Sequence, residues 1–217
     1  MQFKAVVFDL DGTLLNTVED IAFAMNSVLA RNNLPTHRVD DYRFFVGSGL
    51  TNLVYQTLPK EYRAPQYIEQ YLLDVREEYS KCLDDNTKPY SGIYELFDAL
   101  TIKNIPLAIL SNKPHQFMHE TIKTHFSKWS FKIVFGARDG VPTKPDPQSA
   151  IEISEIMNIS PEQIVYVGDA DVDMITATRA GMYPVGVSWG FRPVSELLEN
   201  GAKKIINHPS ELVELFV

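Results

Sequence analysis

The chain has 217 residues, enough to bury a core without disulfides and to form one large domain or one domain with a modest insertion. Acidic residues outnumber basic ones by 28 to 20, and the net charge of −8 disfavours a general nucleic-acid binder. Cys82 is the single cysteine, which excludes an intrachain disulfide and favours a reducing compartment. Asp9 interrupts the first apolar run, and no apolar stretch reaches the length of a membrane span. We therefore expect a cytoplasmic protein that binds neither nucleic acid nor membrane.

The first predicted strand, residues 4–8, is short, apolar and rich in β-branched residues, as is typical of a buried strand in a parallel sheet. Residues 16–86 then show no convincing buried strand. Helical spacing occupies three stretches of that segment, with prolines between them, at 17–32, 49–58 and 66–83. The sequence thus predicts a helical cap over residues 16–86, inserted into a core of residues 1–15 and 87–217.

The rest of the chain alternates between predicted strands and helices. Strands are expected at residues 106–110, 132–135, 164–167 and 183–187, and helices at 114–126, 146–157 and 171–180. Strands that alternate with helices of this length are typical of right-handed βαβ units. We therefore predict an α/β fold with a doubly wound, Rossmann-like parallel sheet and an inserted helical cap.

Two carboxylates follow the first strand, at the edge where open α/β sheets bind ligands. Asp9 and Asp11 are two residues apart on an extended chain, so their side chains point the same way, and Gly12 then permits a tight turn. An Asx turn that caps the next helix would also explain the pattern. A calcium loop is a weaker alternative because its later ligands are missing.

Two further loops offer groups that suit an anion. Ser111-Asn112-Lys113 follows a predicted strand, where a hydroxyl and backbone N–H groups at a helix start either hold a phosphate or merely cap the helix. Lys144 precedes a proline and is either a fixed positive charge or a solvated residue at a helix start. Neither loop is decisive by itself.

Asp169 stands at the end of the predicted strand 164–167, and Asp173 follows it closely. Acidic residues at a helix start also suit the helix dipole. Strand-end carboxylates that face each other, such as Asp9 and Asp169, need a cation or a proton between them. Few oxygen ligands with open positions suit Mg²⁺ completed by water and phosphate. The coincidence of these loops at one sheet edge indicates a phosphoryl-transfer site.

These segments resemble the motifs of the haloacid dehalogenase-like hydrolase superfamily, in the family's order and across nearly the whole chain. The motifs are Phe8-Asp9-Leu10-Asp11-Gly12-Thr13-Leu14, Ser111-Asn112-Lys113-Pro114, Lys144-Pro145-Asp146-Pro147 and Gly168-Asp169 with Asp173. Within the superfamily the phosphoglycolate phosphatase-like branch is the most similar. Its extended second motif, the stretch Phe45-Val46-Gly47-Ser48-Gly49-Leu50 and Ser188-Trp189-Gly190-Phe191 carry that likeness. Asn16-Thr17 and Ala170 depart from the branch, where Asp-Ser and Ser are usual.

The resemblance implies a Mg²⁺-dependent phosphatase that acts on a small phosphomonoester, with 2-phosphoglycolate as the favoured substrate. Asp9 would be the nucleophile that forms an aspartyl phosphate, and Asp11 the general acid and base. The phosphate-binding groups would come from Ser111, Asn112 and Lys144. The metal ligands would be Asp9, the Asp11 carbonyl and Asp169, supported by Asp173, Gly12 and Thr13.

The cap is less informative than the core motifs. Arg43, Gly47 and Ser48 are candidates to bind a substrate carboxylate through a guanidinium fork and N–H groups, or else a solvated residue and a turn. Aromatic residues at roughly helical spacing are expected to pack within the cap; they are Tyr62, Tyr67, Tyr71 and Tyr79.

Several related activities have to be weighed. Asp11 disfavours a dehalogenase or a phosphonate hydrolase, because the similar enzymes lack a carboxylate there. Inorganic pyrophosphatase and a β-phosphoglucomutase-like isomerase remain alternatives. A catalytically inactive binding protein is the least expected, because none of the motif residues Asp9, Asp11, Lys144 and Asp169 has been lost. The protein is expected to act as a monomer or a homodimer.

Overall fold

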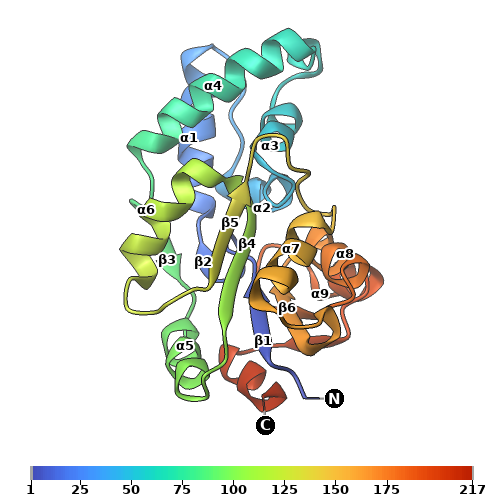
Figure 1. Ribbon diagram of the computed structural model, residues 1–217. Helices are drawn as coiled ribbons and strands as arrows, with labels where there is room; N and C mark the ends of the chain where they lie inside the picture. The colour runs from blue at the N-terminus through green and yellow to red at the C-terminus, as the bar shows by residue number, and fades with distance from the viewer. Residues whose placement is uncertain (1, 217) are drawn as a thin grey trace.

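The computed structural model describes residues 2–216, and its main sheet is parallel (Figure 1). Within those residues the sheet has six strands in the order β5-β4-β1-β6-β7-β8. Their bounds are β1 Ala5–Phe8, β4 Leu107–Pro114, β5 Ile133–Ala137, β6 Ile164–Gly168, β7 Tyr183–Val187 and β8 Lys204–Ile206. The chain builds outward from β1 to one side and then returns to its other side. This order confirms the predicted doubly wound α/β fold.

Helices cover both faces of this sheet, because alternate residues of the central strands face opposite sides. One face packs against α5 (Ile93–Ile102) and the 3₁₀ helix η4 (Pro209–Leu215). The other face packs against α7 (Gln148–Met157) and α8 (Asp171–Arg179). Every residue of β1 is therefore buried, which explains its uninterrupted apolar sequence. Nearer the edges lie α6 (His115–Phe126) and α9 (Val194–Glu199).

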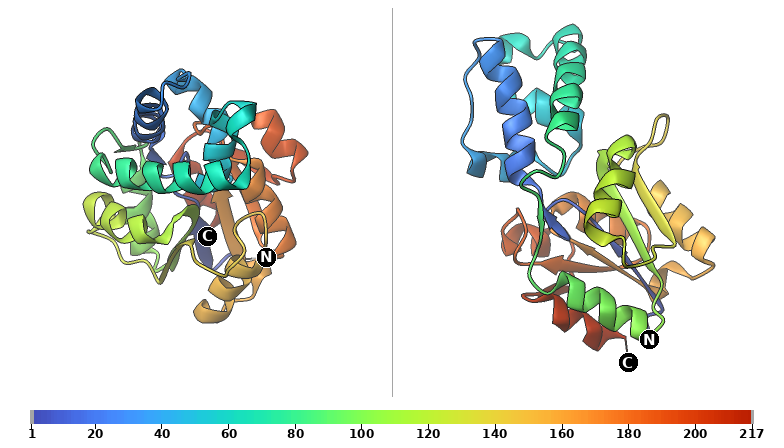
Figure 2. Two further views of the ribbon diagram at one scale, coloured as in Figure 1. Left: turned by 90° about the horizontal axis from the view of Figure 1, so that it is seen from above. Right: turned by 90° about the vertical axis from the view of Figure 1, so that its left-hand side faces the viewer.

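A group of helices between β1 and β4 stands over the edge toward which the strands point, while both chain ends lie at the opposite end (Figures 1 and 2). These helices are α1 Val18–Arg31, α2 Tyr42–Phe45, α3 Leu50–Thr57 and α4 Pro65–Lys81. They share a hydrophobic cluster that Phe117 and Phe191 from the core join. A short antiparallel pair, β2 (Leu15–Asn16) with β3 (Lys88–Pro89), brings the two connections to this cap together.

The elements α5, α9 and β8 are not among those predicted from the sequence. No helix within residues 2–216 combines the length and the apolar character needed to cross a membrane. The expected cytoplasmic location and the monomeric or dimeric state stay predictions.

Asp20 fastens the base of the cap. This buried residue in the first turn of α1 accepts hydrogen bonds from the backbone N–H of Asn86 and of Thr87, both at 2.9 Å. It also accepts from the Asn86 amide at 2.9 Å and from the Thr87 hydroxyl at 2.7 Å. The segment that returns from the cap is thereby fixed to the start of the segment that enters it.

We expect Asp20→Ala to lower the free energy of unfolding by about 3 kcal/mol, because its donors lose their acceptor in a largely buried place. Urea denaturation measures this loss. Glu19→Ala, at the exposed neighbour in the same turn, is the matched control and should change stability by less than about 0.5 kcal/mol. Equal effects of the two substitutions would contradict the role assigned to Asp20.

Candidate active site

The ends of β1 and β6 bring the predicted carboxylates together. The two strands are neighbours in the sheet, so Asp9 and Asp169 emerge side by side. Asp173, in the first turn of α8, completes the group, and one oxygen of each of these residues lies within 4.8 Å of the others. All three side chains are buried. The coincidence inferred from the motif loops is thus present in the fold.

Lys144 lies between two of these carboxylates. Its Nζ donates to Asp9 Oδ1 at 2.6 Å and to Asp173 Oδ1 at 2.7 Å. Burial by itself would lower the pKa of Lys144, but Asp173 and Asp9 outweigh it and raise this pKa well above its usual value. Lys144 is therefore a buried, permanently charged ammonium and not a solvated lysine at a helix start.

Asp169 is held by loops from both sides. The Thr13 hydroxyl donates to its Oδ1 at 3.0 Å, and the Phe191 backbone N–H donates to its Oδ2 at 2.7 Å. A Cβ on Gly12 would lie 2.2 Å from the Asp169 carboxylate, and one on Gly190 would lie 2.2 Å from its Cβ. Only glycine fits at either position. The loop after β7, which carries the family likeness in Ser188-Trp189-Gly190-Phe191, thus also positions Asp169. A glycine just beyond a strand end is the sequence signal for this positioning role.

The charge balance of this cluster fits a divalent cation. Asp9, Asp169 and Asp173 oppose the single ammonium of Lys144. Burial and Asp173 raise the pKa of Asp9 despite Lys144, and the same two causes raise the pKa of Asp169 to about 7. These shifts reflect a shortage of positive charge around oxygen ligands, which are the ligands that hard cations such as Mg²⁺ prefer.

The structure differs from the expectation at residues 111–113. This segment belongs to the extended end of β4, and α6 begins only at His115. The pairing of β4 with β5 shifts register between Leu110 and Pro114, so side chains do not alternate regularly here, and the Lys113 backbone N–H donates to Ser111 Oγ at 3.1 Å. Any phosphate-binding N–H groups here therefore come from an extended chain, because Pro114 separates the segment from the helix.

Asn112 connects the core loops with the cap. Its Nδ2 donates to the carbonyl oxygens of Gly47 and Lys144, both at 3.0 Å. Its Oδ1 accepts from the Lys144 backbone N–H at 2.9 Å. The side chain thus positions Lys144, whereas phosphate binding by the Asn112 N–H stays a prediction.

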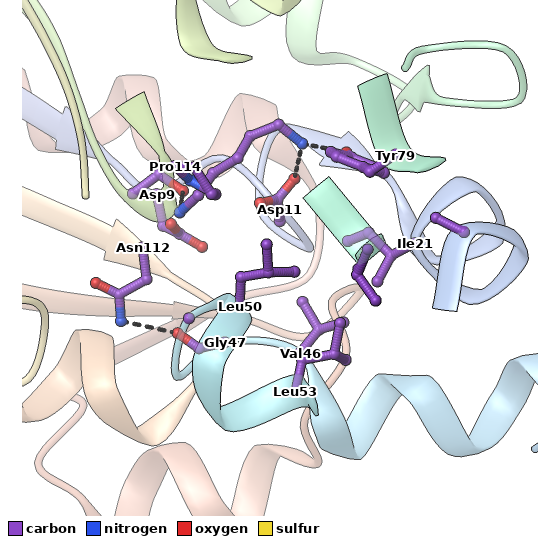
Figure 3. Close-up of a pocket in the computed structure, with 15 residues that line it drawn as sticks. Asp9, Asp11, Ile21, Val46, Gly47, Leu50, Leu53, Tyr79, Asn112 and Pro114 are labelled. Carbon is purple, nitrogen blue, oxygen red and sulfur yellow. Dashed lines mark hydrogen bonds and ion pairs between the residues drawn. The ribbon is translucent and has the colours of Figure 1, made fainter. Parts of the chain in front are cut away.

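A cavity lies between the motif loops and the cap (Figure 3). Asp9, Asp11 and Ser111 belong to its core side. The cap side is largely apolar, and its aliphatic side chains are those of Ile21, Ala24, Val46, Leu50, Leu53 and Val75. A ligand that reaches Asp9 and Asp11 therefore lies beside hydrocarbon of the cap.

The structure places the cap candidates differently from one another. Gly47 lines the cavity, whereas Arg43 and Ser48 are not among the residues that line it. The Arg43 Nε lies 3.8 Å from Asp40 Oδ1, and its guanidinium lies 6.0 Å from the centre of the Phe191 ring. Arg43 is held at these neighbours, so the structure does not support its predicted contact with a substrate carboxylate.

The four cap tyrosines do not share one role. Tyr62 packs edge-on against Tyr67 and Tyr71, with ring centroids 5.5 and 6.3 Å away, as the helical spacing predicts. Tyr79 instead lines the cavity, and its hydroxyl accepts a hydrogen bond from Lys113 Nζ. Tyr79 thus belongs to the cap's hydrophobic cluster, as predicted, and in addition contacts the core.

The fold is a capped α/β fold with a cluster of buried carboxylates at the carboxyl edge of its sheet. More specifically, the chain belongs to the haloacid dehalogenase-like hydrolase family, whose sequence model matches residues 6–187.

The chain is also similar to individual proteins over nearly its whole length. The phosphoglycolate phosphatase of Aquifex aeolicus is 28% identical over 212 residues, which cover 98% of this chain and 96% of the relative. That of Psychrobacter arcticus is 29% identical, over 99% of this chain and 96% of its own. Among solved structures, a provisionally assigned phosphoglycolate phosphatase from Lactobacillus delbrueckii superposes with a TM-score of 0.92 at 28% identity, covering 100% of this chain and 99% of the other.

Gly190→Ala is expected to displace Asp169 and to lower hydrolytic turnover by about 100-fold, since a shift of about 1 Å in a catalytic group has this effect. Steady-state kinetics give the turnover, and circular dichroism checks the fold. Gly140→Asn is the control, because no atom lies within 4 Å of a Cβ there and Asn tolerates its φ of +73°. Normal turnover in Gly190→Ala would show that Asp169 is not tightly positioned.

Proposed function

We propose that the protein is a Mg²⁺-dependent phosphatase that hydrolyses 2-phosphoglycolate through an aspartyl phosphate on Asp9. The observation that carries the proposal is the placement of Asp9 and Asp11 in one cavity, with the Lys144 ammonium 2.6 Å from Asp9. The relatives from Aquifex aeolicus and Psychrobacter arcticus, both phosphoglycolate phosphatases, support the choice of substrate.

In the first half-reaction, an Asp9 carboxylate oxygen attacks phosphorus and forms the acyl phosphate bond while the ester P–O bond breaks. Asp11 donates its proton to the departing alkoxide oxygen. The Ser111 hydroxyl and the Asn112 N–H donate hydrogen bonds to the phosphoryl oxygens. Lys144 offsets the negative charge that gathers at Asp9 and on the phosphoryl group.

In the second half-reaction, water attacks the phosphorus of the aspartyl phosphate. Asp11, now a carboxylate, accepts a proton from that water, and the bond between phosphorus and Asp9 breaks. Inorganic phosphate leaves, and both aspartates return to their starting states. The cap limits the water that reaches the intermediate and excludes large substrates.

The Mg²⁺ ion would be held by Asp9, the Asp11 main-chain carbonyl and Asp169. When bound, it would supply positive charge to the phosphoryl oxygens. Asp173 would support this site indirectly, because it holds Lys144 at 2.7 Å.

The apolar cap wall bears on the alternatives. A β-phosphoglucomutase-like isomerase needs polar partners for the several hydroxyl groups of a sugar. The hydrocarbon groups of Leu50, Leu53 and Val75 offer none. A small leaving group suits this wall better.

We expect 2-phosphoglycolate to have the highest kcat/KM in a panel that also contains pyrophosphate, β-glucose 1-phosphate and p-nitrophenyl phosphate. Phosphate release and product analysis measure the panel. Asp9→Asn, purified in parallel, should show no turnover and controls for contaminating phosphatases. Faster hydrolysis of pyrophosphate, or transfer of labelled phosphate between sugar positions without release, would assign the protein to one of the alternatives.

Removal of divalent metal should abolish turnover, and added Mg²⁺ should restore it. Ca²⁺ should inhibit, because it prefers more ligands at longer distances and would displace Asp9 relative to phosphorus. Turnover is measured after dialysis against chelator and again after titration with each ion. Undiminished activity in excess chelator would contradict metal binding by Asp9 and Asp169.

A further inference from the structure

Lys113 is a second buried ammonium, and the proposed reaction steps do not use it. Its side chain is 2% exposed, and its Nζ lies 3.4 Å from Asp11 Oδ1. The Nζ also donates to the Tyr79 hydroxyl and lies 4.6 Å from the centre of the Tyr79 ring; dashed lines in Figure 3 mark the contacts at Asp11 and Tyr79.

Apart from Asp11 and Tyr79, the cavity around the Lys113 ammonium is largely apolar. Among the described residues that line the cavity, Lys113 is the only one with a basic side chain. A buried charge next to hydrocarbon is unfavourable unless it is well paired. The distance of 3.4 Å to Asp11 exceeds the roughly 2.7–2.9 Å of a strong charge-assisted hydrogen bond. The ammonium therefore has the capacity to bind a closer anion that enters the cavity.

We propose that Lys113 binds a carboxylate on the leaving group and thereby selects substrates that carry one next to the ester carbon. This inference rests on the proposed phosphatase function, because it requires the leaving oxygen to lie beside Asp11. In an ester of glycolate, the carboxylate oxygens lie about 3 Å from the ester oxygen. A leaving group that is hydrogen-bonded to Asp11 thus carries its carboxylate to the neighbouring ammonium.

Tyr79 is the positioning residue for this ammonium. Burial raises the pKa of Tyr79, so it is a neutral phenol whose oxygen accepts from Lys113. Phe117 packs edge-on against its ring, with centroids 5.3 Å apart, and fixes the orientation of the ring. Tyr79 lies on α4 of the cap and Lys113 on β4 of the core, so the proposed carboxylate site forms only where the two meet.

The test compares 2-phosphoglycolate with ethyl phosphate, which is similar in size but has no carboxylate. In the wild type, kcat/KM should favour 2-phosphoglycolate by at least about 100-fold. Lys113→Met should lower this preference by about 100-fold, and Lys113→Arg should retain part of it. Lys123→Met makes the same chemical change at an exposed position of α6 and should retain the full preference. Tyr79→Phe should raise KM for 2-phosphoglycolate about tenfold, with a smaller change in kcat.

Binding provides a second measurement that does not depend on turnover. In the Asp9→Asn background, calorimetry with Mg²⁺ present should show that Lys113→Met weakens the binding of 2-phosphoglycolate about 100-fold. The same substitution should weaken the binding of ethyl phosphate far less. The inference is overturned if Lys113→Met weakens the binding of both esters equally, or if the wild type does not prefer the carboxylated ester. The wild-type comparison decides the matter even if Lys113→Met does not fold. If the wild type hydrolyses neither ester, the proposed function fails, while the binding data still decide the role of Lys113.

Discussion

The ion pairs of the buried Lys144 ammonium with Asp9 and Asp173 are the interaction on which the arrangement of side chains at the carboxyl edge of the sheet depends. Without it, carboxylates brought together by neighbouring strands would repel each other in a place that water does not reach. Its distances of 2.6 and 2.7 Å are those of strong charge-assisted hydrogen bonds. The loop after β5 must therefore reach back across β4, and the Asn112 amide fixes the Lys144 backbone in that position.

The glycines around Asp169 and Asp173 show that this edge is shaped for carboxylates and not for stability. Gly12, Gly168 and Gly190 each lie where a Cβ would collide with an aspartate side chain. An apolar packing of the same loops would tolerate larger residues and would avoid the shortage of positive charge. Local features that lower stability, such as these glycines and the excess of carboxylates, are expected at functional sites. A bound cation would there balance the negative charge.

The parts of the structure that the sequence predicts are those with local signals. Buried parallel strands are short apolar runs, so the sequence shows which residue follows each strand. Because parallel strands end at one edge of the sheet, Asp9 and Asp169 could be predicted to lie together. The contact of Lys113 with Tyr79 could not be predicted, because these residues are 34 positions apart and meet only when the cap lies on the core. Helical spacing places Tyr79 on a helix face but does not say what that face contacts.

The same limitation applies to Arg43, whose contact with a substrate carboxylate stays a prediction. In the fold, the Arg43 side chain lies next to the carboxylate of Asp40 and above the ring of Phe191. Ser111 and Lys113, near the end of β4, meanwhile both line the cavity.

Cap and core thus contribute different physical properties to one cavity. The core supplies charged side chains, and the cap supplies a largely hydrocarbon wall. A low local dielectric strengthens the attraction between Lys113 and an incoming anion, but it equally penalises a substrate whose polar groups find no partner. Asn112 with Gly47 and Lys113 with Tyr79 bridge cap and core within the cavity lining. Because these contacts join cap and core while Lys113 also lines the cavity, the position of the cap and the proposed selection of the leaving group would depend on the same residues.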